Sequence, residues 1–127
     1  MNRLILSLIL SVALGVTSCK SDAKSTANTT QEETTTNISF GVRGNCSMCK
    51  ETIEKAAHTV KGVSNATWSV DKKKIEVSFD ANSTNDIAIH NAIAASGYDT
   101  DKVSGNETAY KNLPSCCQYD RNMAMNQ

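Results

Sequence analysis

Two cysteines separated by two residues are the strongest chemical feature of the sequence. Cys46 and Cys49 stand in the stretch Gly44-Asn45-Cys46-Ser47-Met48-Cys49-Lys50. Thiolates at this spacing can converge on one soft metal ion, exchange electrons with a disulfide, or join in a structural disulfide. Because all three kinds of site use the same spacing, the motif alone does not choose among them.

A second cysteine pair, Cys116-Cys117, lies near the end of the sequence, after Leu113-Pro114. Adjacent cysteines form a mutual disulfide only with strain, because the ring that they close is small. One interpretation is that they form structural disulfides with Cys46 or Cys49. Another is that the tail folds back and adds thiolates to the first pair, or forms a second site. Free thiols and contacts with another protein are further alternatives.

The residues around the first pair predict where it lies in the fold. Residues 37–43 alternate between apolar and small or polar side chains, as in a half-buried strand. From Ser47 onward the period becomes helical, and the apolar stripe consists of Ile53, Ala56, Ala57 and Val60. Lys61-Gly62 ends this helix, with the glycine as a left-handed cap. Cys49 therefore falls in the first helical turn, where unpaired backbone N–H groups favour a thiolate.

A hairpin is predicted next. Residues 66–70 and 75–79 alternate in the same way, and the polar Lys72-Lys73 lies between them. Each of these strands would have one apolar face, and Trp68 and Phe79 would be the bulkiest members of the core.

The rest of the fold is predicted from a second helix and a last strand. The helix has N-cap candidates before an apolar stripe: Ser83, Thr84 and Asp86, then Ile87, Ile89, Ala92, Ile93 and Ser96. Gly97 ends it, and Tyr98 to Val103 is a weak final strand. The order β-α-β-β-α-β predicts an α+β, ferredoxin-like sandwich: an antiparallel four-stranded sheet with two helices on one face.

The first residues carry the pattern of an export signal. A short basic start precedes an almost uninterrupted apolar run from Leu4 to Val16, about the length of a signal-peptide core and short for a membrane span. Val16-Thr17-Ser18-Cys19 resembles the lipobox of bacterial lipoproteins, in which the chain is cut before a cysteine that carries the lipid. We predict a signal peptide over residues 1–18 and lipidation of Cys19. An ordinary signal peptide with an incidental cysteine is the alternative.

The predicted domain organisation follows from the polar tract behind Cys19. Residues 20–36 contain no large apolar side chain, so burial cannot repay their ordering entropy. We predict a lipidated stalk over 19–36, the folded domain over 37–104 and a cysteine-containing tail over 105–127. The expected location is the cell envelope, on a membrane that faces the periplasm or the cell exterior, where thiols can oxidise. Basic and acidic residues number 13 each, so charge gives no argument for a nucleic-acid partner.

The sequence resembles the heavy-metal-associated domain family from Ile38 to about Val103. The resemblance is carried by the strand, the CxxC loop, the helix, Gly62-Val63, the hairpin, the second helix and Gly97-Tyr98, in that order. The family includes copper chaperones, the metal-binding domains of copper-pumping ATPases and periplasmic mercury-binding proteins.

The resemblance implies roles for single residues. Cys46 and Cys49 match the family's metal ligands, and Tyr98 matches a tyrosine that lies beside the metal in bacterial copper chaperones. Gly44 stands where the family usually has a methionine that packs under the loop. Met48 is a candidate third ligand, although this position usually faces solvent in the family.

Two cysteines and two histidines also carry side chains that could bind a soft metal ion. Cys116 and Cys117 are candidate accessory ligands in the tail. His58 and His90, by contrast, are expected at the surface or at helix edges rather than as ligands.

The predicted function is the binding of a soft heavy-metal ion, Cu(I) first, for trafficking or scavenging outside the cytoplasm. Hg(II) is the close alternative, and another soft ion is a further one. Transfer would proceed by ligand exchange without catalysis, to a metal-transporting ATPase or another thiol carrier. A thiol–disulfide oxidoreductase and a disulfide-stabilised structural module are the competing functions. The oxidoreductase is disfavoured because Pro114, the one proline, lies beyond the last predicted strand, where it is poorly placed to be a substrate-binding cis-proline beside the CxxC motif.

Overall fold

The computed structural model describes residues 34–126. The predicted signal peptide, Cys19 and nearly all of the predicted stalk lie outside these residues. All of the described residues belong to one compact unit. Within this part of the chain, no helix is both long enough and apolar enough to span a bilayer.

Three antiparallel strands form the sheet, in the spatial order β1-β3-β2. Their bounds are Thr35–Gly41 for β1, Val63–Ser69 for β2 and Lys74–Asp80 for β3. Val77 of the central strand lies opposite Ile38 on one side and Ala66 on the other, so the three apolar faces point the same way. The predicted alternation and hairpin are confirmed, and Trp68 and Phe79 are buried in the core.

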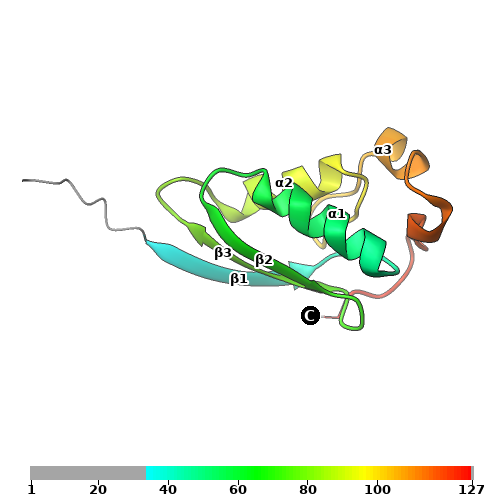
Figure 1. Cartoon of the computed structure of the whole chain (residues 1–127), viewed down its shortest axis with the longest axis horizontal. Helices are drawn as coiled ribbons and strands as arrows, with labels where there is room; N and C mark the ends of the chain where they lie inside the picture. The colour runs from blue at the N-terminus through cyan, green and yellow to red at the C-terminus, as the bar shows by residue number, and fades with distance from the viewer. Residues whose placement is uncertain (1–33, 127) are drawn as a thin grey trace, which may run out of the picture. The chain divides into compact units, whose positions relative to one another are not determined.

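Two helices cover one face of the sheet: α1, Ser47–His58, and α2, Asp86–Ala95 (Figure 1). Their fully buried side chains include Ile53, Ala57, Ile89 and Ile93. Gly62 has φ +95°, which confirms the left-handed residue predicted after the first helix.

Two details of the prediction for the second helix were wrong. The N-cap is Asn85, whose side chain accepts a hydrogen bond from the Ala88 N–H at 3.0 Å, rather than one of the three neighbours that were expected. Ile87 is 44% exposed, so it does not widen the apolar stripe. Ile87 lies two residues before Ile89, about 200° around the helix from it, so it falls outside the buried stripe of α2.

The predicted fourth strand was also wrong. Across the described residues, only an isolated bridge between Val42 and Thr100 occupies the edge beside β1. The Thr100 hydroxyl accepts hydrogen bonds from the backbone N–H groups of Val103, at 2.9 Å, and Lys102, at 3.3 Å. The Thr100 N–H donates to the Val103 carbonyl at 2.8 Å. These contacts close a tight turn and use backbone groups that a longer ladder would need.

His90 is buried, which corrects its predicted position at the surface or a helix edge. It is 1% exposed, its ring stacks on Phe40 at 3.8 Å between centroids, and its Nδ1 lies 2.8 Å from the Thr100 hydroxyl. Burial lowers the pKa of the imidazole. His90 therefore serves as a neutral core residue, whereas His58 is exposed, as predicted.

The chain continues beyond the sandwich into a short helix, α3, Glu107–Lys111, and a 3-10 turn, η1, Ser115–Cys117. Figure 1 shows this segment lying beside the N-terminal end of α1 and then running on toward the turn between β2 and β3. The second cysteine pair therefore lies at the same end of the domain as the first.

Candidate metal centre

The CxxC cysteines lie at the start of α1. Cys46 is the N-cap residue and is partly exposed, whereas Cys49 is completely buried in the first turn. Their Sγ atoms are 3.8 Å apart. The backbone N–H of Asn45 donates to the Cys49 Sγ at 3.3 Å. The two thiols thus lie side by side, one open to the surface and one against the core.

The helix N-terminus acts most clearly on Cys46. Backbone N–H groups lower the pKa of the Cys46 thiol. The N–H of Cys49 has the largest effect, and the N–H of Met48 also lowers this pKa. A thiolate is the form that binds metal and the form that attacks a disulfide. The thiol that is accessible is therefore also the one that the local backbone prepares for reaction.

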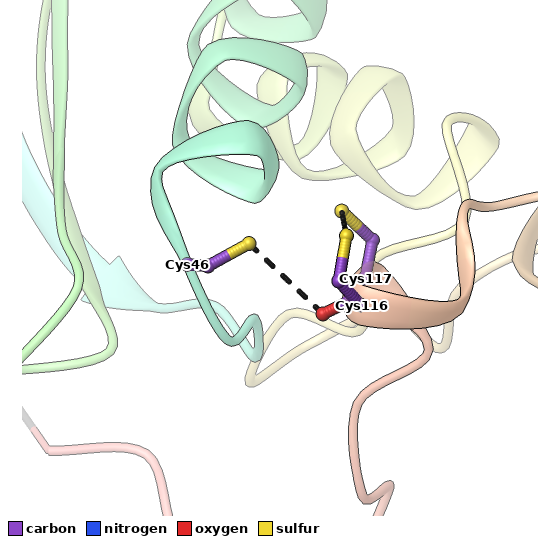
Figure 2. Close-up of side chains that lie close together, drawn as sticks. All are labelled: Cys46, Cys116 and Cys117. Atoms are coloured by element: carbon purple, nitrogen blue, oxygen red, sulfur yellow. Dashed lines mark hydrogen bonds between the residues drawn. The ribbon is translucent and has the colours of Figure 1, made fainter.

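The tail brings a second pair of thiols to the same place. Figure 2 shows the Cys46 side chain pointing toward η1, which carries Cys116 and Cys117. The Sγ atoms of these three cysteines all lie within 4.8 Å of one another, and the two in η1 are 4.0 Å apart. The Met48 Sδ is 3.6 Å from the Cys116 Sγ. The fold-back of the tail is the arrangement that the structure contains.

No disulfide joins the cysteines of the described chain. Cys46, Cys49, Cys116 and Cys117 are all free thiols. The alternative in which the tail cysteines bridge to the first pair is therefore not what the structure contains. Sulfur is the donor that selects soft metal ions, whereas hard cations such as Mg²⁺ prefer oxygen. Four thiols and a thioether in one place give this centre a soft character.

Comparisons with known proteins fit this geometry. The family model of the heavy-metal-associated domain matches residues 44–99. Oxidized MerP from Ralstonia metallidurans CH34 is 31% identical, with a TM-score of 0.51 over 53% of this chain and 94% of that one. The chain belongs to the heavy-metal-associated domain family. Its ferredoxin-like fold is thereby confirmed.

Two other solved structures of this family are similar to the chain. The CopZ metallochaperone is 26% identical, with a TM-score of 0.50 over 51% of this chain and 98% of that one. A copper-binding domain from HMA7, a P-type ATPase, is 29% identical, with a TM-score of 0.50 over 51% and 89%. No curated protein matches the chain significantly. The match to the family model ends before α3, so the segment that carries Cys116 and Cys117 lies outside it.

The structure explains the glycine that departs from the family's usual methionine. A Cβ atom on Gly44 would lie 3.0 Å from Cη2 and 3.1 Å from Cζ2 of the Trp68 ring, and 3.2 Å from the Cys49 Cβ. The indole therefore fills the space under the loop. Its Nε1 donates to the Val42 carbonyl at 3.0 Å, which fixes the ring in place. A tryptophan from β2 thus supports the loop in this chain.

A polar pair on α1 fixes the same part of β2. The Lys50 Nζ donates to the Trp68 carbonyl at 2.9 Å, and the Glu54 carboxylate accepts from the Trp68 N–H at 2.8 Å. Lys50 and Glu54 also form an ion pair with each other. These contacts around Trp68 position the first turn of α1, and with it the thiols.

Tyr98 and Cys117 form the buried floor of the centre. Tyr98 is completely buried, and its hydroxyl makes no hydrogen bond within the described residues. Burial, with the Cys117 and Cys49 side chains beside it, raises the pKa of Tyr98. Burial and the neighbouring Cys49 also raise the pKa of the Cys117 thiol to about 12. Tyr98 therefore lies next to the buried cysteines of the two pairs.

The residue that anchors the tail was not predicted from the sequence. Tyr119 is 1% exposed and stacks on Tyr98 at 5.7 Å between ring centroids. The signal that was available is aromatic: Tyr110 and Tyr119 flank the cysteine pair in a mostly polar tail. Large rings at such positions are more typical of a packed segment than of a disordered one.

Proposed function

We propose that this protein binds a soft heavy-metal ion, Cu(I) first, through Cys46 and Cys49, for trafficking or scavenging outside the cytoplasm. The observation that carries the proposal is the pair of thiols 3.8 Å apart at the start of α1. A metallochaperone and a copper-binding ATPase domain, 26% and 29% identical, are solved structures of the same family. Thiolates are ligands that Cu(I) prefers.

The two cysteines differ in a way that suits ligand exchange. Cys46 is the partly exposed thiol of the pair and has the lowered pKa, so it would meet an incoming ion first. Cys49 is buried and would complete the site from the core side. In the reverse direction a partner's thiolates replace these two ligands one at a time, without covalent chemistry on a substrate. A metal-transporting ATPase or another thiol carrier is the partner that this exchange requires.

Hg(II) is the alternative cargo, because the family includes periplasmic mercury-binding proteins and Hg(II) also favours thiolates. The same soft donor set serves both ions. A competition in which each ion is offered to the loaded protein separates the two assignments.

The proposed location depends on residues outside the described chain. The lipobox-like Val16-Thr17-Ser18-Cys19 supports a lipid on Cys19 and a membrane anchor in the cell envelope. A bacterial host that expresses the full chain with a metabolic fatty-acid label tests this. Labelled protein should partition into detergent, and Cys19→Ala should remove both the label and the partitioning. A labelled Cys19→Ala protein would refute the assignment.

The binding proposal is tested by an anaerobic Cu(I) titration of the reduced fragment Lys20–Gln127 against a chromophoric chelator. This fragment contains the whole compact unit of described residues. We expect competition with the chelator, and its loss in the double variant Cys46→Ser/Cys49→Ser. Failure of the unsubstituted fragment to compete would reject the copper assignment and lead to the same titration with Hg(II).

A further inference from the structure

The turn that carries Cys116 and Cys117 is held by contacts that need no metal ion. The buried Tyr119 hydroxyl accepts a hydrogen bond from the Asp99 N–H at 2.7 Å and donates one to the Gly97 carbonyl at 2.9 Å. The Tyr110 hydroxyl donates to the Tyr119 carbonyl at 2.7 Å. The tail is therefore docked by the residues that flank η1.

A second set of contacts joins the tail to the segment between β1 and the CxxC loop. The Arg121 guanidinium pairs with the Asp99 carboxylate, at 2.6 Å between the nearest atoms. Arg43 pairs with the same carboxylate at 3.3 Å, and its Nε donates to the Met123 carbonyl at 2.7 Å. Asp99 is thus shared by one arginine three residues before Cys46 and another four residues after Cys117. Both thiol-bearing segments are positioned from one buried carboxylate.

The sulfur–sulfur distances are already those of a metal site. A metal–sulfur bond of about 2.3 Å puts two thiolates on one ion roughly 3.8 Å apart in a tetrahedral site and roughly 4.6 Å apart in a linear one. The Cys46–Cys49 and Cys116–Cys117 pairs are at 3.8 and 4.0 Å, and the Cys46–Cys116–Cys117 triangle lies within 4.8 Å. Side-chain rotations alone can therefore bring these sulfurs onto one ion.

The two loops also face each other through polar contacts. The Asn45 side-chain amide donates to the Cys116 carbonyl at 3.2 Å, and the Cys46 Sγ lies 4.0 Å from the same oxygen (Figure 2). Met48 is 49% exposed, and its Sδ lies 3.6 Å from the Cys116 Sγ. These contacts fix the position of the CxxC loop relative to η1 beside the sulfurs.

The Tyr98 hydroxyl is the second, independent indication of a ligand. An unpaired buried hydroxyl costs stability, and its neighbours here are the Cys49 and Cys117 side chains. Metal-bound thiolates are much better acceptors than neutral thiols, since a charged partner strengthens a hydrogen bond. The donor therefore gains its partner when the cysteines carry a metal ion.

We propose that Cys46, Cys116 and Cys117 form a three-thiolate site for one soft metal ion, with Cys49 as a fourth sulfur at its edge. The inference rests on the proposed function and deepens it, because the ion is held by two segments of the chain rather than by the CxxC loop alone. Each thiol that becomes a ligand releases its proton to solvent, and the metal keeps its oxidation state. An ion with three or more sulfur ligands must lose several of them to leave, so the site suits retention.

The test is Cu(I) loading of the reduced fragment Lys20–Gln127 with one equivalent, followed by X-ray absorption and chelator competition. We expect three or more sulfur ligands in the unsubstituted fragment. The variant Cys116→Ser/Cys117→Ser should keep the CxxC pair, fall to two sulfur ligands and lose about tenfold or more in affinity, which is the scale on which supporting groups act at metal sites.

Two further variants keep the test informative. Cys117 is buried, so Cys117→Ser could disturb the turn. Cys116 is exposed, and Cys116→Ser alone should still lower the number of sulfur ligands. Ser115→Ala, in the same turn, should leave three thiolates in place. Circular dichroism of each metal-free variant checks the fold.

The outcomes separate this inference from the proposed function. Two sulfur ligands and equal affinity in the unsubstituted fragment and in the tail variant would overturn the three-thiolate site and leave CxxC binding intact. Undiminished binding by Cys46→Ser/Cys49→Ser would also overturn it, because the tail pair would then act alone. Absence of binding in every form would reject the proposed function, and this inference with it.

Discussion

Removal of one hydroxyl should show how firmly the tail is docked. Tyr119→Phe keeps the buried ring and its stacking on Tyr98, but it deletes both hydrogen bonds of the hydroxyl. The Asp99 N–H and the Gly97 carbonyl, both in buried hydrogen bonds to this hydroxyl, then lose their partner. The perturbation is therefore polar and leaves the shape of the core unchanged.

The magnitude follows from these two orphaned groups. A buried donor or acceptor that loses its partner costs about 1–3 kcal/mol, so the pair should cost about 2–6 kcal/mol of unfolding free energy. For a domain of this size, 1 kcal/mol corresponds to a Tm shift of about 4–8 °C. We therefore expect Tyr119→Phe to lower the Tm of the reduced, metal-free fragment by about 8 °C or more.

The matched control is the same substitution at the neighbouring ring. Tyr98 is buried as deeply, yet its hydroxyl makes no hydrogen bond in the described structure, so Tyr98→Phe should be neutral or stabilise the metal-free fragment by about 1 kcal/mol. Both variants are measured by thermal and urea denaturation under reducing conditions. A Tm for Tyr119→Phe within about 2 °C of the unsubstituted fragment would refute the reasoning, since that is less than half a kcal/mol on this scale.

Three further predictions concern other parts of the structure. The pKa of Cys117 is raised from 9.0 to about 12, so the folded state binds more protons than the unfolded state above about pH 9. Stability should therefore fall as the pH rises from about 9 toward 12. Urea midpoints of the reduced, metal-free fragment and of Cys117→Ser should diverge over this range, and parallel curves would contradict the prediction. Gly44→Ala should cost about 1–3 kcal/mol by overpacking against Trp68, and a urea midpoint equal to that of the unsubstituted fragment would show that the loop yields freely. Gly97→Ala should cost more, because φ is +100° there and the new Cβ would lie 2.8 Å from the Tyr110 N; a thermal melt at the original Tm would rule out that strain.

The parts of the fold that the sequence predicted well are those governed by apolar periodicity. Phe40, Val77 and Ile53 alternate or repeat with a fixed period, and burial of their faces decides where each element lies. The errors arose where a polar side chain competes for the backbone. The Thr100 hydroxyl closes a turn in place of a strand, and Asn85 takes the cap from its neighbours. Such competition is local and leaves no periodic trace.

The candidate site divides in the same way. Cys46 and Cys49 were predictable because their spacing and their place before a helix are both visible in the sequence. The docking of Cys116 and Cys117 was left open among several alternatives, since it depends on long-range contacts. The Tyr119 hydroxyl reaches backbone groups about twenty residues away, which no local pattern encodes.

The exposure of the sulfurs sets the order in which a partner can take the metal from the proposed site. Cys46 and Cys116 reach solvent, whereas Cys49 and Cys117 are buried. An incoming thiolate must therefore approach from the Cys46–Cys116 side and displace those ligands first. Loosening the tail by Tyr119→Phe should speed this transfer while Cys49 stays in place, and stopped-flow transfer to a chelator measures it. An unchanged rate, with the tail shown to be destabilised, would mean that exchange begins elsewhere.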